Sequence, residues 1–220
     1  MKRIIFLLII ISYLFPICFA DIEVKPYYIN SIRRTGIGLT SITSPLIMRQ
    51  EPNDEGKILE TLNFDFKTNK PNCLINKQRC SIDEVFTLYK QDKKTAFLST
   101  IDETENWSLV CFNQTENPIC GWIKEDKNKY YTWPEFYNYY GKKYGLYFLK
   151  DVQKTDRILY SAPVKQTNST GSIEMAKHIA PWLVQGNWVL VKALDFGNKP
   201  KTGWLNYRAN DGKLKLFVDF

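Results

Sequence analysis

The sequence predicts a mainly β protein built from two related modules, and three observations support this fold class. One pattern occurs twice: a turn with Pro, a Gly before an apolar residue, an Asn-Trp strand and a Gly-Trp pair. Short runs rich in β-branched, aromatic or Leu residues recur between turn formers, as strands do. Near the C-terminus, Asp211 and Gly212 lie between two such runs and predict a tight hairpin turn joining them.

The two copies of the pattern are in register with each other. Trp107 and Trp122 are 15 residues apart in the first copy, and Trp188 and Trp204 are 16 apart in the second. Because the spacing between the two tryptophans is nearly the same in both copies, two copies of one β module are favoured. The strands expected most clearly are 97–101, 107–112, 188–193 and 214–220.

This arrangement resembles the bacterial SH3 (SH3b) family of small β-barrels, which occur in exported cell-envelope proteins. The family pattern runs Leu-x-Val-Arg-x-x-Pro, then Gly-x-Val, a Trp strand and Gly-Trp-Val. The first copy keeps Leu46, Arg49 and Pro52, whereas the second keeps Pro163 but lacks the Arg. The resemblance implies two small SH3-like β-barrels that cover most of residues 39–220 and are joined by a short aromatic-rich segment.

Residues 1–20 have the three-part layout of a secretory signal peptide. Lys2 and Arg3 precede an apolar run, and Ala20 supplies a small residue before Asp21. We therefore expect cleavage after residue 20 and no membrane span in the mature chain. An uncleaved anchor is the alternative, but the run is shorter than the roughly 20 residues of a spanning helix.

Cleavage would remove Cys18 and leave four cysteines, an even set that predicts disulfides in an exported chain. The four are Cys73, Cys80, Cys111 and Cys120. Pairing within 73–80 and within 111–120 is favoured because turn formers lie in both intervals, although four cysteines allow three connectivities. A zinc site is the alternative, but the spacing is not that of zinc knuckles. We expect no metal.

Composition limits the classes of partner. The chain has 30 basic and 23 acidic residues, and loss of Lys2 and Arg3 leaves 28 basic residues and a net charge of +5. Basic and acidic residues are interspersed as on a solvated surface, so we expect no nucleic-acid partner. Hydrophobic residues make up 44% and aromatic residues 15%, which argues against disorder.

The spacing of motifs divides the chain into segments. They are a signal peptide (1–20), an extended lead-in without a recognisable site (21–38), a first module (39–126), an aromatic linker or helix (127–148) and a second module (149–220). The first module carries about 34 extra residues between Gly56 and Asn106 relative to the second. We interpret this insertion as a decoration braced by a disulfide, with a recognition loop as the alternative.

The aromatic-rich segment between the modules is suited to a short helix. Thr132 would be the N-cap, Pro134 would lie in the first turn, and Gly141 and Gly145 would stop the helix. Helical spacing would place four aromatic residues on one stripe, namely Trp133, Phe136, Tyr137 and Tyr140. We expect the stripe to be core between the modules. A carbohydrate-stacking or partner-binding surface is the alternative, because Tyr and Trp present flat apolar faces.

The chain offers few groups for catalysis, so we expect no enzyme and no catalytic residue. His178 is the sole histidine, and the mature cysteines are assigned to disulfides. We find no Gly-rich phosphate loop in the sequence, and we expect no cofactor. His178 is expected in a surface or half-buried loop. A divergent hydrolase is the enzymatic alternative.

The resemblance implies a non-catalytic, exported protein that binds a cell-envelope component, with peptidoglycan as the first candidate. It places the protein in the periplasm, at the cell surface or outside the cell. Carried over by motif, the residues expected to border the binding groove are Trp107, Trp122, Trp188 and Trp204. A structural role is the alternative for each of them. Docking onto another envelope protein or enzyme is the alternative function.

Overall fold

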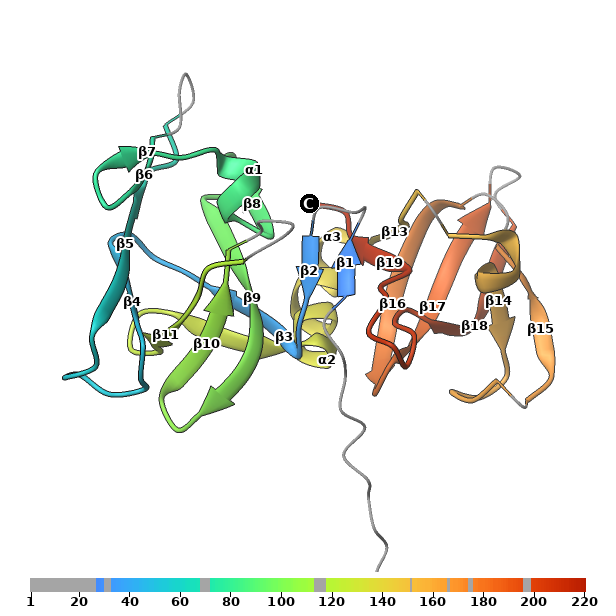
Figure 1. The fold of residues 1–220 in the computed structure, drawn as a ribbon. Helices are drawn as coiled ribbons and strands as arrows, with labels where there is room; N and C mark the ends of the chain where they lie inside the picture. The colour runs from blue at the N-terminus through green and yellow to red at the C-terminus, as the bar shows by residue number, and fades with distance from the viewer. Residues whose placement is uncertain are drawn as a thin grey trace, which may run out of the picture.

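A computed structural model describes residues 27–29, 33–67, 72–112, 118–150, 152–165, 167–173, 176–195 and 199–220, with only the backbone described for 27–29, 33–35, Lys177 and Asp195. The expected signal peptide lies outside the described residues. Strands dominate and helices are short, so the all-β class is confirmed (Figure 1). Two large antiparallel sheets lie on either side of a helical segment, next to a small hairpin of β1 (Tyr27–Ile29) and β2 (Arg33–Thr35).

The first sheet contains ten of the described strands. They are β3 (Gly38–Ser41), β4 (Leu46–Arg49), β5 (Ile58–Phe64), β6 (Cys73–Ile75), β7 (Gln78–Arg79), β8 (Leu88–Lys90), β9 (Thr95–Thr104), β10 (Trp107–Cys111), β11 (Cys120–Lys124) and β12 (Lys129–Thr132). Their order is β12-β3-β9-β10-β11-β4-β5-β6-β7, with β8 also beside β9. A short helix, α1 (Ile82–Val85), precedes β8.

The second sheet contains seven described strands. They are β13 (Leu146–Phe148), β14 (Ile158–Tyr160), β15 (Ser169–Ser172), β16 (Ala176–Gln185), β17 (Trp188–Asp195), β18 (Pro200–Asn206) and β19 (Leu216–Val218). Their order is β15-β14-β18-β17-β16-β13-β19. A 3-10 turn, η3 (Lys154–Arg157), precedes β14.

The two sheets share one topology. The order β12-β3-β9-β10-β11-β4-β5 corresponds strand by strand to β19-β13-β16-β17-β18-β14-β15, and β6, β7, α1 and β8 are additions in the first module. The motif residues also pair in the same register, with Trp122 opposite Leu109 and Trp204 opposite Leu190. Closure of either sheet into a barrel stays a prediction.

The glycine of each Gly-Trp pair allows a neighbouring strand to approach closely. A Cβ at Gly121 would lie 3.0 Å from the Cβ of Met48, and one at Gly203 would lie 2.9 Å from the Cβ of Leu159. Met48 and Leu159 are buried core residues on β4 and β14. The same steric need therefore accounts for the glycine in both copies.

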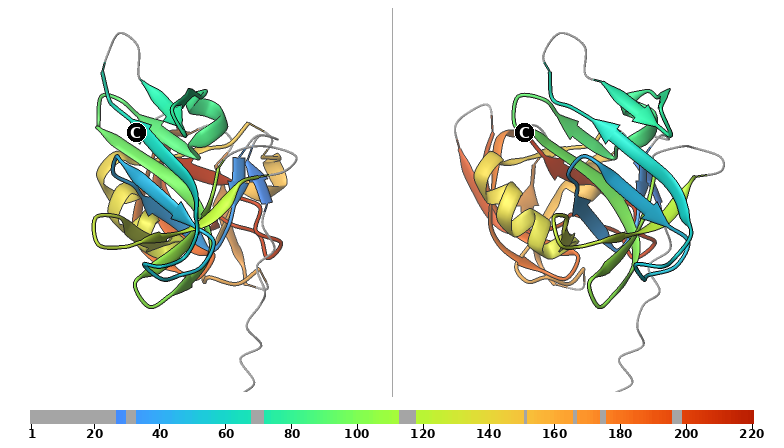
Figure 2. Two further views of the ribbon diagram at one scale, coloured as in Figure 1. Left: turned by 60° about the vertical axis from the view of Figure 1, so that its left-hand side comes forward. Right: turned by 90° about the vertical axis from the view of Figure 1, so that its left-hand side faces the viewer.

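The helical segment begins where the sequence predicts. The Thr132 side chain accepts a hydrogen bond from the Glu135 amide, and the Glu135 carboxylate accepts one from the Thr132 amide, which forms a capping box. The segment runs through α2 (Trp133–Phe136), η2 (Tyr137–Gly141) and α3 (Lys142–Tyr144), which together form the yellow coil seen from two further sides in Figure 2. The prediction that Gly141 would stop the helix is wrong, because the φ of Gly141 is −61°, a helical value. Gly145 ends the helix with φ of +87°.

Both ends of the expected linker are strands of the two sheets. Residues 129–132 pair with β3, and residues 146–148 pair with β16 and β19. The helical part is therefore limited to residues 133–144.

The aromatic stripe is core, as expected. Trp133, Phe136 and Tyr137 are at most 1% exposed, while Tyr140 is partly buried. They share one core with residues from both sheets, including Phe97 of β9 and Val189 of β17. Leu98, which follows Phe97 in β9, belongs to a second core within the first module. Strand β9 therefore packs on both faces and couples the two cores.

A buried contact between the modules involves Gly36, in the segment where the sequence showed no site. The carbonyl of Gly36 accepts hydrogen bonds from Trp133 Nε1 at 2.8 Å and from Arg208 Nη2 at 2.7 Å. Arg208 is 3% exposed, and this burial lowers the pKa of its guanidinium. A Cβ at Gly36 would lie 1.8 Å from the carbonyl oxygen of Thr100, so only glycine fits this position.

The predicted C-terminal turn is present, but its strands pair differently from the expectation. Gly212 has φ of +89°, and the Ala209 amide donates to the Lys213 carbonyl at 2.8 Å. The flanking segments are joined by a single bridge between Arg208 and Leu214. The last strand, β19, pairs with β13 instead of β18, because β17 and β14 already occupy the two edges of β18.

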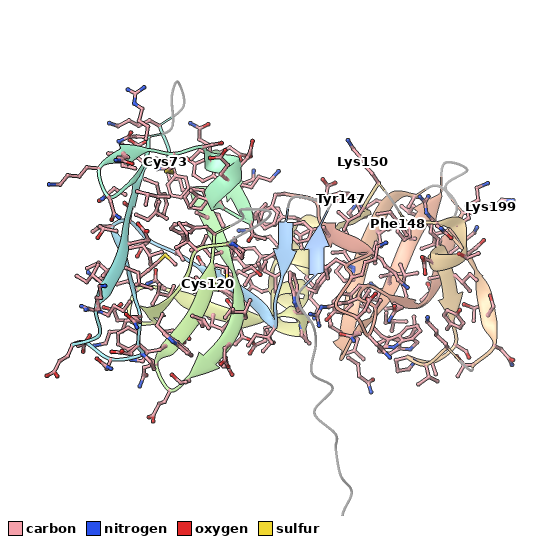
Figure 3. The ribbon with its side chains drawn as sticks, in the orientation of Figure 1. Cys73, Cys120, Tyr147, Phe148, Lys150 and Lys199 are labelled. Carbon is pink, nitrogen blue, oxygen red and sulfur yellow. A yellow bond between two sulfur atoms is a disulfide. The ribbon has the colours of Figure 1, made fainter. Side chains whose placement is uncertain are left out.

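Both disulfides connect near neighbours, as favoured from the sequence. Cys73 is bonded to Cys80 in the insertion, and Cys111 on β10 is bonded to Cys120 on β11. Figure 3 labels Cys73 and Cys120, one cysteine of each disulfide, and both lie in the first module. His178 is exposed, as expected, but it lies in strand β16, so the loop assignment is wrong.

Candidate functional site

The four predicted tryptophans lie on the outer faces of the sheets. Residues that are directly opposite on antiparallel strands share a face. Trp107 is opposite Lys124, and Trp122 is opposite both Leu109 and Arg49. None of the four tryptophans belongs to either core formed by the described residues. In each module, therefore, two motif tryptophans contribute to one outer face.

The outer face of the first module contains a pocket of about 300 Å³ beside Trp107. Trp107 is 8% exposed, so most of its surface is packed. Trp122 is half-buried and does not line this pocket. The lining residues are Thr43, Ser44, Pro45, Leu46, Ile47, Arg49, Asp54, Trp107, Lys124, Asp126, Lys127 and Asn128.

Three basic and two acidic side chains surround the pocket. Arg49 Nη1 donates to the carbonyl of Gly56 at 2.7 Å, which ties β4 to the loop before β5. Lys124 Nζ lies 2.5 Å from an Asp54 oxygen and 5.8 Å from the centre of the Trp107 ring. Lys124 and Asp54 are both exposed, so their ion pair contributes little to stability and can open for a ligand.

One wall of the pocket is held by Asn128, which is 8% exposed. Its Oδ1 accepts from the Thr43 amide at 2.9 Å, and its Nδ2 donates to the Lys124 carbonyl at 2.8 Å. These two hydrogen bonds connect the chain before β4 to the end of β11. The pocket is consequently shaped by fixed backbone segments before any ligand arrives.

The corresponding face of the second module is aromatic but uncharged at the equivalent positions. Trp188 is opposite Asn206, where the first module has Lys124, and Trp204 is opposite Tyr160, where the first has Arg49. The Tyr160 ring packs edge-on against Trp188, with centroids 5.6 Å apart. Trp188 and Trp204 are half-buried. The two faces therefore differ in charge although their tryptophans correspond.

Acidic residues also gather near the turn between β9 and β10. Burial raises the pKa of the Glu103 carboxyl, and repulsion from Glu125, Glu135 and Asp102 adds to this effect. Glu125 accepts a hydrogen bond from the Ser108 hydroxyl, and Glu135 is the capping residue described above. Within the described part of the chain, no group of three or more potential ligands could hold a metal ion.

The sequence predicts the tryptophans of this site but not its basic groups. The repeated motif includes Arg49 but assigns it no role. Lys124 follows Trp122 by two residues, so the alternation of a β-strand alone places both on one face. That periodicity could have identified Lys124, whereas Lys127 and Asp54 reach the pocket from loops whose course the pattern does not predict.

Comparisons with family models, with curated proteins and with solved structures find no match to this chain. The helices among the described residues are all too short or too polar to cross a membrane.

Proposed function

We propose that this is an exported, non-catalytic protein that binds a component of the cell envelope, with peptidoglycan as the first candidate. The observation that carries the proposal is the pocket beside Trp107, on the face where Arg49 and Trp122 of the SH3b-like motif also lie. Two disulfides are compatible with an oxidising compartment outside the cytoplasm.

The chemistry of the pocket suits a peptide that carries carboxylates. The Trp107 ring and the 42% exposed Ile47 offer apolar contact. Arg49, Lys124 and Lys127 offer cationic groups to carboxylates. Because the lysines are exposed, their share of the affinity is expected to weaken as salt is added.

Co-sedimentation of residues 21–220, disulfides intact, with purified protein-free peptidoglycan tests the proposal. Lys124→Glu is expected to reduce the sedimented fraction severalfold at low salt. Lys154→Glu is the matched control, since Lys154 is exposed in the second module and the change in net charge is the same.

A second pair of variants removes apolar contact without a change in charge. Ile47→Ser is expected to weaken sedimentation, whereas Val164→Ser is not, because the 46% exposed Val164 belongs to the second module and does not line the pocket. Absence of sedimentation by the unmodified protein, or equal losses in both members of each pair, would overturn the proposal.

Docking onto an envelope protein is the second candidate, favoured by exposed apolar residues of the second module. Trp182 and Leu183 are 55% and 51% exposed at an irregularity in β16. This function predicts sedimentation with untreated envelopes that is abolished by protease treatment of the envelopes and by Trp182→Ser. If the protein still sediments with protease-treated envelopes, docking onto an envelope protein is excluded and binding to peptidoglycan is favoured.

A further inference from the structure

The helical segment between the modules also contributes to a second pocket, separate from the face that contains Trp107. This pocket has a volume of about 260 Å³. Strand β12 contributes Lys129 and Tyr131, and the helical segment contributes Glu135, Asn138 and Tyr139. None of these five residues lines the first pocket.

An exposed aromatic ring dominates the pocket. Tyr139 is 58% exposed, although the neighbouring stripe of the same helix is core. Its ring centre lies 6.1 Å from that of Tyr131, tilted by 33°, and 4.8 Å from that of Tyr140, edge-on. Two packed rings thus support Tyr139 while much of its surface is open to solvent. A ring held in this way loses little conformational freedom when a ligand stacks on it.

Polar groups surround the ring. The side-chain amide of Asn138 makes no hydrogen bond to another described residue, so it can both donate to and accept from a ligand. One Glu135 oxygen accepts from Thr132, and the other accepts no hydrogen bond from the described residues. Lys129 Nζ lies 4.8 Å from the centre of the Tyr131 ring. Because Lys129 and Glu135 carry opposite charges, the lining as a whole is neutral.

We propose that this pocket binds one ring of a neutral saccharide. A pyranose ring has an apolar face of C–H groups and a rim of hydroxyls that donate and accept hydrogen bonds. Tyr139 matches the face, and the amide and carboxylate match the rim. The small volume suits a single ring, and the balanced charges favour a neutral ligand over an anionic one. The inference does not depend on the function proposed for the first pocket.

Titration of residues 21–220 with two soluble tetrasaccharides, β-1,4-linked N-acetylglucosamine and β-1,4-linked glucose, tests the inference. NMR line broadening of the sugar and isothermal calorimetry would measure binding. Tyr139→Ala is expected to weaken binding about tenfold, and Asn138→Ala severalfold. Tyr139→Phe, which keeps the ring, is expected to retain most of the affinity.

Tyr147→Ala is the matched control, because Tyr147 is 41% exposed on β13 and does not line this pocket. Far-UV circular dichroism would verify that each variant is folded. Absence of binding to both sugars at millimolar concentration would overturn the inference. So would equal losses in Tyr139→Ala and Tyr147→Ala.

The soluble sugars lack peptide, which separates this test from that of the proposed function. Lys124→Glu is expected to leave sugar binding unchanged, since Lys124 lines only the first pocket. Failure with the sugars therefore leaves intact any sedimentation that Lys124→Glu reduces, and sedimentation that Lys124→Glu does not reduce leaves the sugar result intact.

Discussion

Replacement of Trp133 by Ala is expected to destabilise both modules together. Trp133 is 1% exposed and belongs to the core shared by the two sheets. Its indole also donates to Gly36, which packs against β9 of the first module. The side chain therefore joins the lead-in, the helix and both sheets, so its loss is expected to affect the whole molecule.

The size of the effect follows from these contacts. Truncation of a buried Trp to Ala costs about 3–5 kcal/mol of unfolding free energy. Loss of the Nε1 hydrogen bond adds about 1 kcal/mol. The Gly36 carbonyl keeps its bond from Arg208 and is not left without a partner. The result, about 4–6 kcal/mol, is comparable with the total stability of a typical domain, about 5–15 kcal/mol. A fall in melting temperature of about 10–20 °C is expected.

Calorimetry and hydrogen exchange would measure this loss. One unfolding transition is expected in both the unmodified protein and the variant, and amides of β9 and β17 should lose protection together. Tyr139→Ala, on the exposed side of the same helix, should cost much less, about 1 kcal/mol, because it removes only the contacts of a 58% exposed ring with Tyr131 and Tyr140. Two separate transitions, or loss of protection in β17 with β9 unchanged, would refute the idea of one shared core.

Three further outcomes are expected. Gly203→Ala should cost about 1–3 kcal/mol, because the new Cβ would lie 2.9 Å from that of Leu159; an unchanged urea midpoint would contradict the close approach. Burial raises the phenol pKa of Tyr137 and Tyr207 above the usual value, so the folded state favours the neutral phenols. The stability that these two tyrosines contribute is complete below about pH 10 and is lost as the pH rises further. In an alkaline titration, phenolate absorbance from these two residues should therefore appear only when the protein unfolds. Replacement of Cys111 and its disulfide partner by Ala should lower the unfolding free energy by about 2–3 kcal/mol, which denaturation of the double variant would check.

Features that depend on neighbouring residues could be predicted from the sequence. The capping box at Thr132 involves residues three positions apart, and the turn at Gly212 needs only a local positive φ. The disulfides join cysteines within nine positions of each other. Such features form from contacts that the chain can make before it folds globally, so the pattern of residues is sufficient to predict them.

Features that depend on distant partners could not be predicted in the same way. The pairing of β19 with β13 brings together segments about 70 residues apart, and no turn signal indicates this partner. Gly36 showed no motif, because its role comes from the atoms of Thr100, Trp133 and Arg208 that surround it. Partner choice between strands and close approach of backbones are properties of the assembled sheets.

The candidate site has some features that neighbouring residues determine and others that depend on distant partners. The repeated Trp and Gly-Trp motifs indicate two equivalent faces from the sequence, since strand periodicity is local. The charge on the first face and the exposed Tyr139 beside a buried stripe follow from packing between segments that are distant in the chain. Residue order alone thus indicated an all-β duplication with its caps, turns and disulfides. Long-range packing selected which tryptophan borders a basic pocket and which aromatic residue of the helix stays open to solvent, because burial depends on what the rest of the chain places against each side chain.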